Sequence, residues 1–114
     1  MRTYKGTVQR GTQRAAALGF PTINIPLTDT EADGIYAAKV RVKDRVYEAA
    51  AFADQSRGVL EAHLLDFSDE LANAEVTIEL LKKIRDNETF PEDEALRAAI
   101  ARDVVTARHY FDSP

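Results

Sequence analysis

The pattern of apolar and polar positions separates a long region of short alternating segments from a terminal segment with a different period. Alternation with a period of two is clearest over residues 34–42, where Tyr36 and Val40 fall on one face and Lys39 on the other. Short apolar runs of the same kind, bounded by turn residues, occupy residues 3–9, 20–25, 45–52, 59–67 and 74–84. We therefore predict about six strands with short connections, which favours an antiparallel barrel or sandwich.

The terminal segment, residues 92–111, has the period of a helix. Its apolar residues recur at spacings of three and four and so share one helical face; they are Leu96, Ala99, Ile100, Val104, Ala107 and Phe111. Acidic residues at its start and basic residues near its end complement the helix dipole. We expect one C-terminal helix packed on the strands, and a single domain over residues 1–114.

The composition and net charge of the chain limit the classes of protein to which it can belong. The chain has 114 residues, of which 45% are hydrophobic, and this suits one domain with a substantial core. The formal net charge of −4 argues against nucleic acid as a partner, because such binders need excess positive charge. The absence of cysteine excludes disulfides and thiolate metal sites. No segment approaches the ~20 apolar residues of a membrane span, and we expect a monomeric cytoplasmic protein without a membrane partner.

One stretch, residues 18–25, interrupts an apolar strand with a glycine, a proline and two small polar residues. Gly19 and Pro21 set an unusual backbone path in front of Thr22 and Asn24. Residues two apart on a strand project to the same side, so this hydroxyl and this amide are neighbours. They can accept hydrogen bonds, or ligate a hard cation together with phosphate oxygens. The alternative is a turn into a strand with two satisfied polar side chains.

Glu61 is an acidic residue inside an apolar strand segment. A carboxylate held on a strand could act as a general base if it faces a cleft, whereas on the other face it would be an ordinary solvated glutamate. His63 shares its face, but a catalytic zinc site normally needs three protein ligands and no third is evident. We therefore favour a packed or surface histidine. The sequence contains no nucleophilic triad at a recognisable spacing and neither glycine-rich phosphate-binding fingerprint.

Four motifs together resemble the riboflavin kinase domain, which also forms the C-terminal half of bacterial bifunctional FAD synthetases. Gly11 precedes residues 18–24, Leu-Gly-Phe-Pro-Thr-Ile-Asn, which are similar to the family's Leu-Gly-Phe-Pro-Thr-Ala-Asn. The other three motifs are residues 33–37, Asp-Gly-Ile-Tyr-Ala, residues 60–67, Leu-Glu-Ala-His-Leu-Leu-Asp-Phe, and residues 83–90, Lys-Ile-Arg-Asp-Asn-Glu-Thr-Phe. The resemblance covers nearly the whole chain.

The resemblance implies a mainly β fold, a closed six-stranded antiparallel Greek-key barrel with one C-terminal helix packed on it. It implies transfer of the γ-phosphoryl group of ATP to the 5′-hydroxyl of riboflavin, which gives FMN and ADP. Thr22 and Asn24 match the residues that hold Mg²⁺ and the nucleotide phosphates, and Glu61 matches the base on the ribityl hydroxyl. Further matching positions around nucleotide and flavin are Gly11, Gly19, Pro21 and Arg85.

The chain also departs from the family pattern. Ala15 and Ala16 stand where the family has Gly-Arg, the short loop 52–58 replaces its Gly-x-x-Pro-Thr segment, and residues 72–73 replace its Tyr-Gly. Two alternatives therefore stay open. One is a non-catalytic flavin- or nucleotide-binding module, or a partner-binding domain, and the other is a plain barrel without a ligand.

Overall fold

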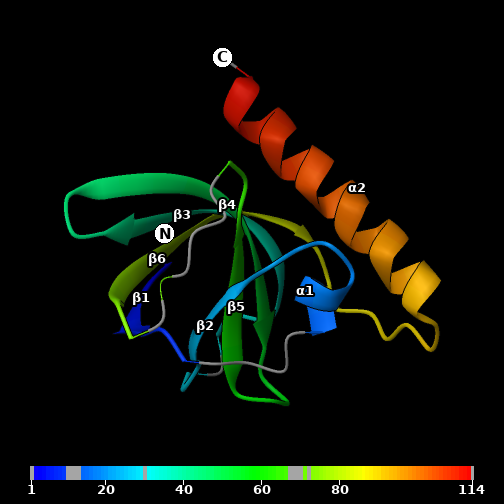
Figure 1. Ribbon diagram of the computed structural model, residues 1–114, viewed down its shortest axis with the longest axis horizontal. Helices are drawn as coiled ribbons and strands as arrows, with labels where there is room; N and C mark the ends of the chain where they lie inside the picture. Colours follow the sequence, from blue (N-terminus) through cyan, green and yellow to red (C-terminus); the bar gives the residue numbers. More distant parts are fainter. Residues whose placement is uncertain (1, 10–13, 30, 67–70, 72, 114) are drawn as a thin grey trace.

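The computed structural model describes residues 2–9, 14–29, 31–66, 71 and 73–113. Within these residues the chain forms six strands and two helices (Figure 1). The strands are β1 (Arg2–Thr7), β2 (Ile23–Pro26), β3 (Gly34–Val42), β4 (Arg45–Asp54), β5 (Val59–Leu64) and β6 (Glu75–Arg85). The helices are α1 (Arg14–Ala17), a single turn, and α2 (Asp93–Asp112).

The strands form one antiparallel sheet in the order β1-β6-β3-β4-β5-β2. Strands β3, β4 and β5 follow one another as hairpins, and β6 returns to lie beside β3, which is the Greek-key arrangement. The two outermost strands, β1 and β2, approach each other and nearly close the sheet into a barrel (Figure 1). The predicted Greek-key barrel with a C-terminal helix is confirmed.

The outermost strands of the nearly closed barrel meet at a narrow seam. The backbone N–H of Gln9 donates to the carbonyl oxygen of Asn24 at 2.8 Å, and this bridge joins the continuation of β1 to β2. A Cβ atom at Gly6 would lie only 3.1 Å from Cβ of Ile25. The missing side chain of Gly6 therefore permits the close approach that a glycine inside a strand indicates.

The alternation read along the strands separates the barrel interior from its outer surface. The interior is filled by apolar side chains from all six strands, with Ile25, Val40, Leu60, Val76 and Ile78 almost fully buried. On β3, Lys39 and Arg41 face outward, as predicted. Strand β4 continues two residues beyond its predicted end, whereas β5 stops at Leu64, and residue 67 lies outside the described residues.

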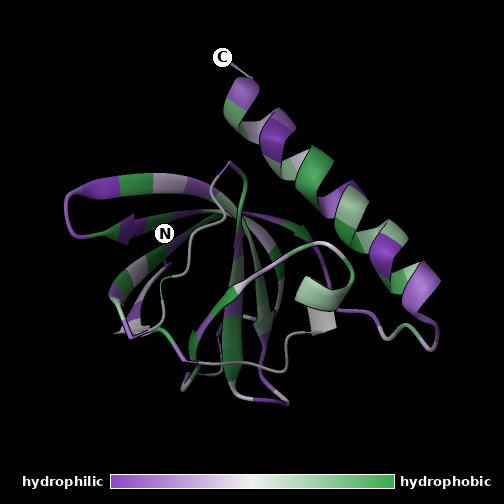
Figure 2. Ribbon diagram, viewed as in Figure 1, coloured by the Kyte–Doolittle hydropathy of each residue, from purple (hydrophilic) through white to green (hydrophobic). Residues whose placement is uncertain are grey.

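Helix α2 crosses the outside of the barrel and packs on β3 and β4 (Figure 1). Its apolar stripe is visible against an otherwise hydrophilic helix in Figure 2. A second small core forms below it from Ala37, Ala50, Leu65 and Ala107, where alanines on the two strands let the helix approach closely. Among the described residues, no helix is both long and apolar enough to cross a membrane.

Candidate functional site

Three of the predicted site residues meet on the outer face of β2 and β5. In the register of this strand pair Asn24 lies directly opposite Glu61, and directly opposed residues carry their side chains on the same face. Thr22 precedes β2, and its hydroxyl donates a hydrogen bond of 3.3 Å to Oε1 of Glu61. The flanking residues Leu60 and Ala62 point into the barrel core. A hydroxyl, an amide and a carboxylate therefore converge in one place.

Each oxygen of the Glu61 carboxylate has a partner among the described side chains. Oε1 accepts from Thr22, and Oε2 accepts from Nη2 of Arg57 at 3.1 Å. Asn24 is 6% exposed, and its Nδ2 donates to the carbonyl oxygen of Gln9 at 3.4 Å. The amide is thus oriented by the barrel seam, with its carbonyl oxygen as the atom that has metal-ligating chemistry.

Thr22 and Glu61 line a pocket of about 280 Å³ between the barrel and the segment that leads into α2. Its wall is apolar where β3, β4, the connecting segment and the helix contribute Ile35, Phe52, Phe90, Leu96 and Ile100. Its polar lining includes Asp54, Arg57, Arg85, Asn87 and Thr89. An apolar pocket with a few convergent polar groups is the usual form of a small-molecule site.

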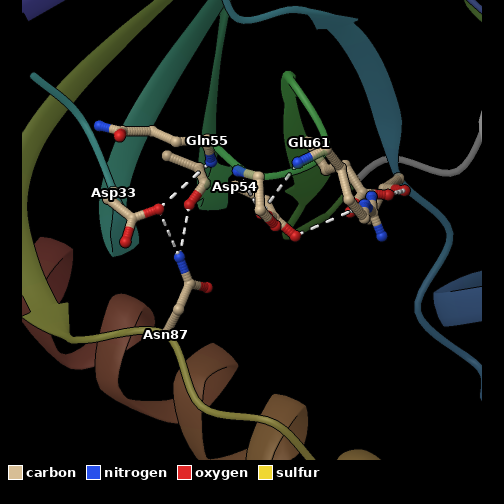
Figure 3. A network of polar contacts seen from close by, with 9 residues as sticks. Asp33, Asp54, Gln55, Glu61 and Asn87 are labelled. Atoms are coloured by element: carbon tan, nitrogen blue, oxygen red, sulfur yellow. Dashed lines mark hydrogen bonds and ion pairs between the residues drawn. The ribbon is translucent and has the colours of Figure 1, made fainter. Parts of the chain in front are cut away.

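The segment that forms one side of this pocket, residues 86–92, is attached to the barrel by Asn87. Figure 3 shows its amide pointing from this segment toward Asp33 and the end of β4. Nδ2 of Asn87 donates to the carbonyl oxygen of Ala53 at 2.7 Å and to Oδ1 of Asp33 at 3.0 Å. The same Asp33 oxygen accepts from the backbone N–H of Gln55 at 3.2 Å. These contacts fix the position of the pocket wall.

Arg85 lies at the end of β6 and also lines the pocket. Its guanidinium makes a two-point contact with Asp103 of α2, Nε to Oδ1 at 2.9 Å and Nη2 to Oδ2 at 2.8 Å. The hydrogen bond to Asp103 raises the pKa of Arg85 above its usual value. The guanidinium carbon also lies 5.6 Å from the ring centroid of Phe90. Arg85 therefore organises the wall that carries Phe90.

The remaining predicted residues lie at the entrance to β2. Gly19 follows α1 and has φ +100, a backbone conformation that favours glycine. The carbonyl oxygen of Pro21 lies 2.8 Å from Nδ1 of His63, whose ring also meets Phe20 edge-on. His63 is thus a packed histidine. Gly11 lies outside the described residues.

Several residues that build the pocket had no role predicted from the sequence. Asp54 ends β4 and Arg57 lies in the turn that follows, where the sequence has no recognisable motif, and the partners of Asn87 are up to 54 positions away in sequence. Asp103 carried a usable signal, because it falls on the buried stripe of α2 between Ile100 and Ala107. A carboxylate on such a stripe requires a polar partner.

A cluster of at least three His, Asp or Glu side chains suited to a metal ion is absent from the described part of the chain. Thr22 and Asn24 offer neutral oxygen atoms instead. Mg²⁺ commonly keeps several waters and is bound through substrate phosphates with few protein ligands. This donor set therefore fits Mg²⁺ that arrives with a nucleotide, and it does not resemble a protein cage for a free metal ion.

Comparison with known proteins agrees with this geometry. The family model described as riboflavin kinase (flavokinase) matches residues 2–111. The bifunctional riboflavin kinase/FMN adenylyltransferase of Haemophilus influenzae is 34% identical over 117 residues, an alignment that covers 95% of this chain and 38% of that protein. The chain therefore spans less than two-fifths of this relative.

Two solved structures share the fold of this chain. The crystal structure of riboflavin kinase from Trypanosoma brucei has a TM-score of 0.67 and 26% identity, and the match covers 98% of this chain and 80% of that chain. A Streptococcus pneumoniae crystal structure named as a macrolide-efflux protein has a TM-score of 0.77 and 26% identity, over 93% of this chain and 36% of that chain.

Proposed function

This chain belongs to the riboflavin kinase family, and we propose that it transfers the γ-phosphoryl group of ATP to the 5′-hydroxyl of riboflavin, with FMN and ADP as products. The observation that carries the proposal is the convergence of Thr22, Asn24 and Glu61 beside an apolar pocket. Phosphoryl transfer depends mostly on positioning and charge neutralisation. A site of this kind needs one base, a set of phosphate and metal ligands, and a pocket for the acceptor.

The pocket suits riboflavin as the acceptor. A flavin has a flat, largely apolar ring system and a polar ribityl chain. The side chains of Ile35, Phe52 and Phe90 provide an apolar surface for the rings. Glu61 and Thr22 line the same pocket, which lets the ribityl chain extend from the rings toward the carboxylate.

Glu61 is proposed as the general base. It accepts the proton of the 5′-hydroxyl while that oxygen forms a bond to the γ-phosphorus and the bond from the γ-phosphorus to the bridging oxygen of ATP breaks. ADP leaves with the electron pair of that bond. Thr22 holds Oε1 of the carboxylate in place before the reaction begins, and a fixed base shortens the search for the reactive geometry.

Thr22 and Asn24 are proposed to hold the nucleotide phosphates and Mg²⁺. Members of the family generally use Mg²⁺ with ATP, and the hydroxyl and amide oxygens present here are hard donors that this cation accepts. Mg²⁺, when bound, neutralises part of the charge on the phosphates. Gly19 and Pro21 shape the backbone that leads to Thr22.

The proposal is tested by incubating the purified protein with riboflavin, ATP and Mg²⁺ and separating FMN from riboflavin by chromatography. We expect FMN from the wild-type protein. Glu61→Gln should lower kcat by at least about 100-fold, because a general base contributes roughly 10²–10⁴-fold. The control is Glu48→Gln, which changes an exposed glutamate on β4 and should leave kcat unchanged.

The alternative of a non-catalytic module rests on Ala15 and Ala16, which stand where the family has Gly-Arg, and on the short loop 52–58, which replaces its Gly-x-x-Pro-Thr segment. It makes a different prediction for the same protein. Titration of flavin fluorescence with and without MgADP would then show binding, while no FMN would form even at protein concentrations near that of the substrate. This combination would overturn the kinase proposal and favour the binding module.

A further inference from the structure

The turn between β4 and β5, residues 55–58, carries an arginine that contacts the proposed base. Nη2 of Arg57 lies 3.1 Å from Oε2 of Glu61, and Nε lies 3.5 Å from Oδ2 of Asp54. This turn belongs to the loop that departs from the family pattern. The resemblance therefore assigns no role to Arg57, although its side chain lines the pocket.

Asp54 anchors both the turn and the arginine. Its Oδ1 accepts hydrogen bonds from the backbone N–H of Ser56 at 3.0 Å, from the Ser56 hydroxyl at 2.7 Å and from the backbone N–H of Arg57 at 3.3 Å. Its other oxygen faces the guanidinium of Arg57. Figure 3 shows Asp54 between the Asp33–Asn87 cluster and Glu61. Asp54 therefore holds Arg57 both through the backbone N–H and through the guanidinium.

The exposed fractions of the two side chains indicate that this ion pair orients the Glu61 carboxylate more than it stabilises the fold. The side chain of Arg57 is 46% exposed and that of Glu61 is 16% exposed. A pair with one well-solvated partner contributes little to folding. It does restrict rotation of the carboxylate, because Oε1 is held by Thr22 while Oε2 is held by Arg57. A general base must present its oxygen within about 2.6–3.2 Å of the hydroxyl, so this restriction matters for catalysis.

We propose that Arg57 is a positioning residue for the base: the chain of contacts from Asp54 through Arg57 to Glu61 sets the orientation of the carboxylate for the 5′-hydroxyl of riboflavin. This inference rests on the proposed kinase function. Arg57 acts through Glu61 and does not contact the transferred group. It therefore affects kcat and leaves the affinity for ATP unchanged.

The first test compares Arg57→Gln and Arg57→Lys in the FMN assay, with ATP varied while riboflavin is saturating. We expect Arg57→Gln to lower kcat about 10-fold, less than the ~100-fold that a 1 Å misplacement of a reactive group can cost, because Thr22 still holds Oε1. KM for ATP should stay within about two-fold of wild type. Arg57→Lys should restore part of kcat, since an ammonium reaches one carboxylate but cannot span Asp54 and Glu61 with a planar fork. The control is Arg97→Gln, which removes an arginine of 45% side-chain exposure from an exposed pair with Glu94.

The second test asks whether the effect passes through Glu61. Glu61→Asp draws the carboxylate back by one methylene, out of reach of Arg57, so adding Arg57→Gln to this variant should lower kcat less than two-fold. If the full 10-fold loss persists there, Arg57 does not act through Glu61. If Arg57→Gln raises KM for ATP by a larger factor than it lowers kcat, Arg57 contacts the nucleotide. Either result would show that the positioning role is wrong. An unchanged kcat in Arg57→Gln would overturn this inference alone. A wild-type protein that makes no FMN would overturn the proposed function, and the inference with it.

Discussion

The hydroxyl of Tyr4 on β1 donates a hydrogen bond of 2.9 Å to Oδ2 of Asp29, a residue 25 positions further along the chain. Burial and this hydrogen bond to a carboxylate raise the pKa of Tyr4 to about 12, above its ordinary value of 10.0. The tyrosinate form is disfavoured because its negative charge would be partly removed from water and would lie beside the Asp29 carboxylate. The pKa of this side chain thus depends on a residue from a different segment of the chain.

This raised pKa makes stability depend on alkaline pH. Above pH 10.0 the unfolded chain releases the Tyr4 proton while the folded chain keeps it up to about pH 12. The folded state then binds more protons, so its contribution to stability is complete below pH 10.0 and decreases as pH rises toward 12. We expect urea denaturation across this range to show a smaller loss of stability in Tyr4→Phe than in wild type.

The matched control is Tyr110→Phe, which changes an exposed tyrosine on α2. This variant should lose stability with pH as the wild-type protein does. Equal pH dependence in Tyr4→Phe and wild type would show that Tyr4 does not contribute.

At the scale of elements, the position of α2 against the barrel depends on a polar contact as well as on its apolar stripe. Asp103 is 3% exposed within that stripe and forms its two-point ion pair with Arg85 at the end of β6. The pair joins the last strand to the middle of the helix. The intervening residues 86–92, which carry Phe90, are thereby held over the pocket.

Asp103→Ala should remove about 3 kcal/mol from the free energy of unfolding, because loss of one partner leaves a half-buried arginine without its carboxylate. Urea denaturation measures this value. The comparison variant is Glu94→Ala, which breaks an exposed pair on the same helix and should cost less than about 1 kcal/mol. Equal losses in the two variants would mean that the buried pair does not hold α2 in place.

At the scale of the whole molecule, the barrel depends on the seam where β1 meets β2. Gly6 lies against Ile25, a residue that is 1% exposed and has little room to shift. On the other side of the seam the carbonyl oxygen of Asn24 accepts the Gln9 N–H, and Asn24 lies directly opposite Glu61 of β5. Closure of the barrel therefore also determines the position of a proposed phosphate-binding residue.

Gly6→Val should lower the free energy of unfolding by about 2 kcal/mol, since overpacking of a well-filled site typically costs about 1–3 kcal/mol. The loss is measured by urea denaturation, with Lys5→Val as the control. Lys5 is exposed on the same strand, and valine is well suited to a strand there. A Gly6→Val protein as stable as Lys5→Val would contradict a tight seam.

Local periodicity was sufficient to predict the elements. In a strand with one buried face apolar residues recur at every second position, and in a helix with one apolar stripe they recur at every third or fourth position. The strand of residues 34–42 and the C-terminal helix were found in this way, and the Greek-key order came from the resemblance. The residues Thr22, Asn24 and Glu61 were also identified from sequence, and their roles remain predictions to be tested.

Only the tertiary structure showed which side chains meet. Arg57 reaches Glu61 because a four-residue turn folds back on its strand, and Asn87 reaches Asp33 because β6 ends beside the start of β3. The contact of Asn87 with Asp33 and that of Thr22 with Glu61 join segments that no local period connects, and they depend on strand register, which places a side chain on one face or the other. The sequence by itself determined the strands, the helix and the candidate chemistry, and its family resemblance indicated the barrel. The pocket and the orientation of the proposed base follow from the contacts that the folded chain makes.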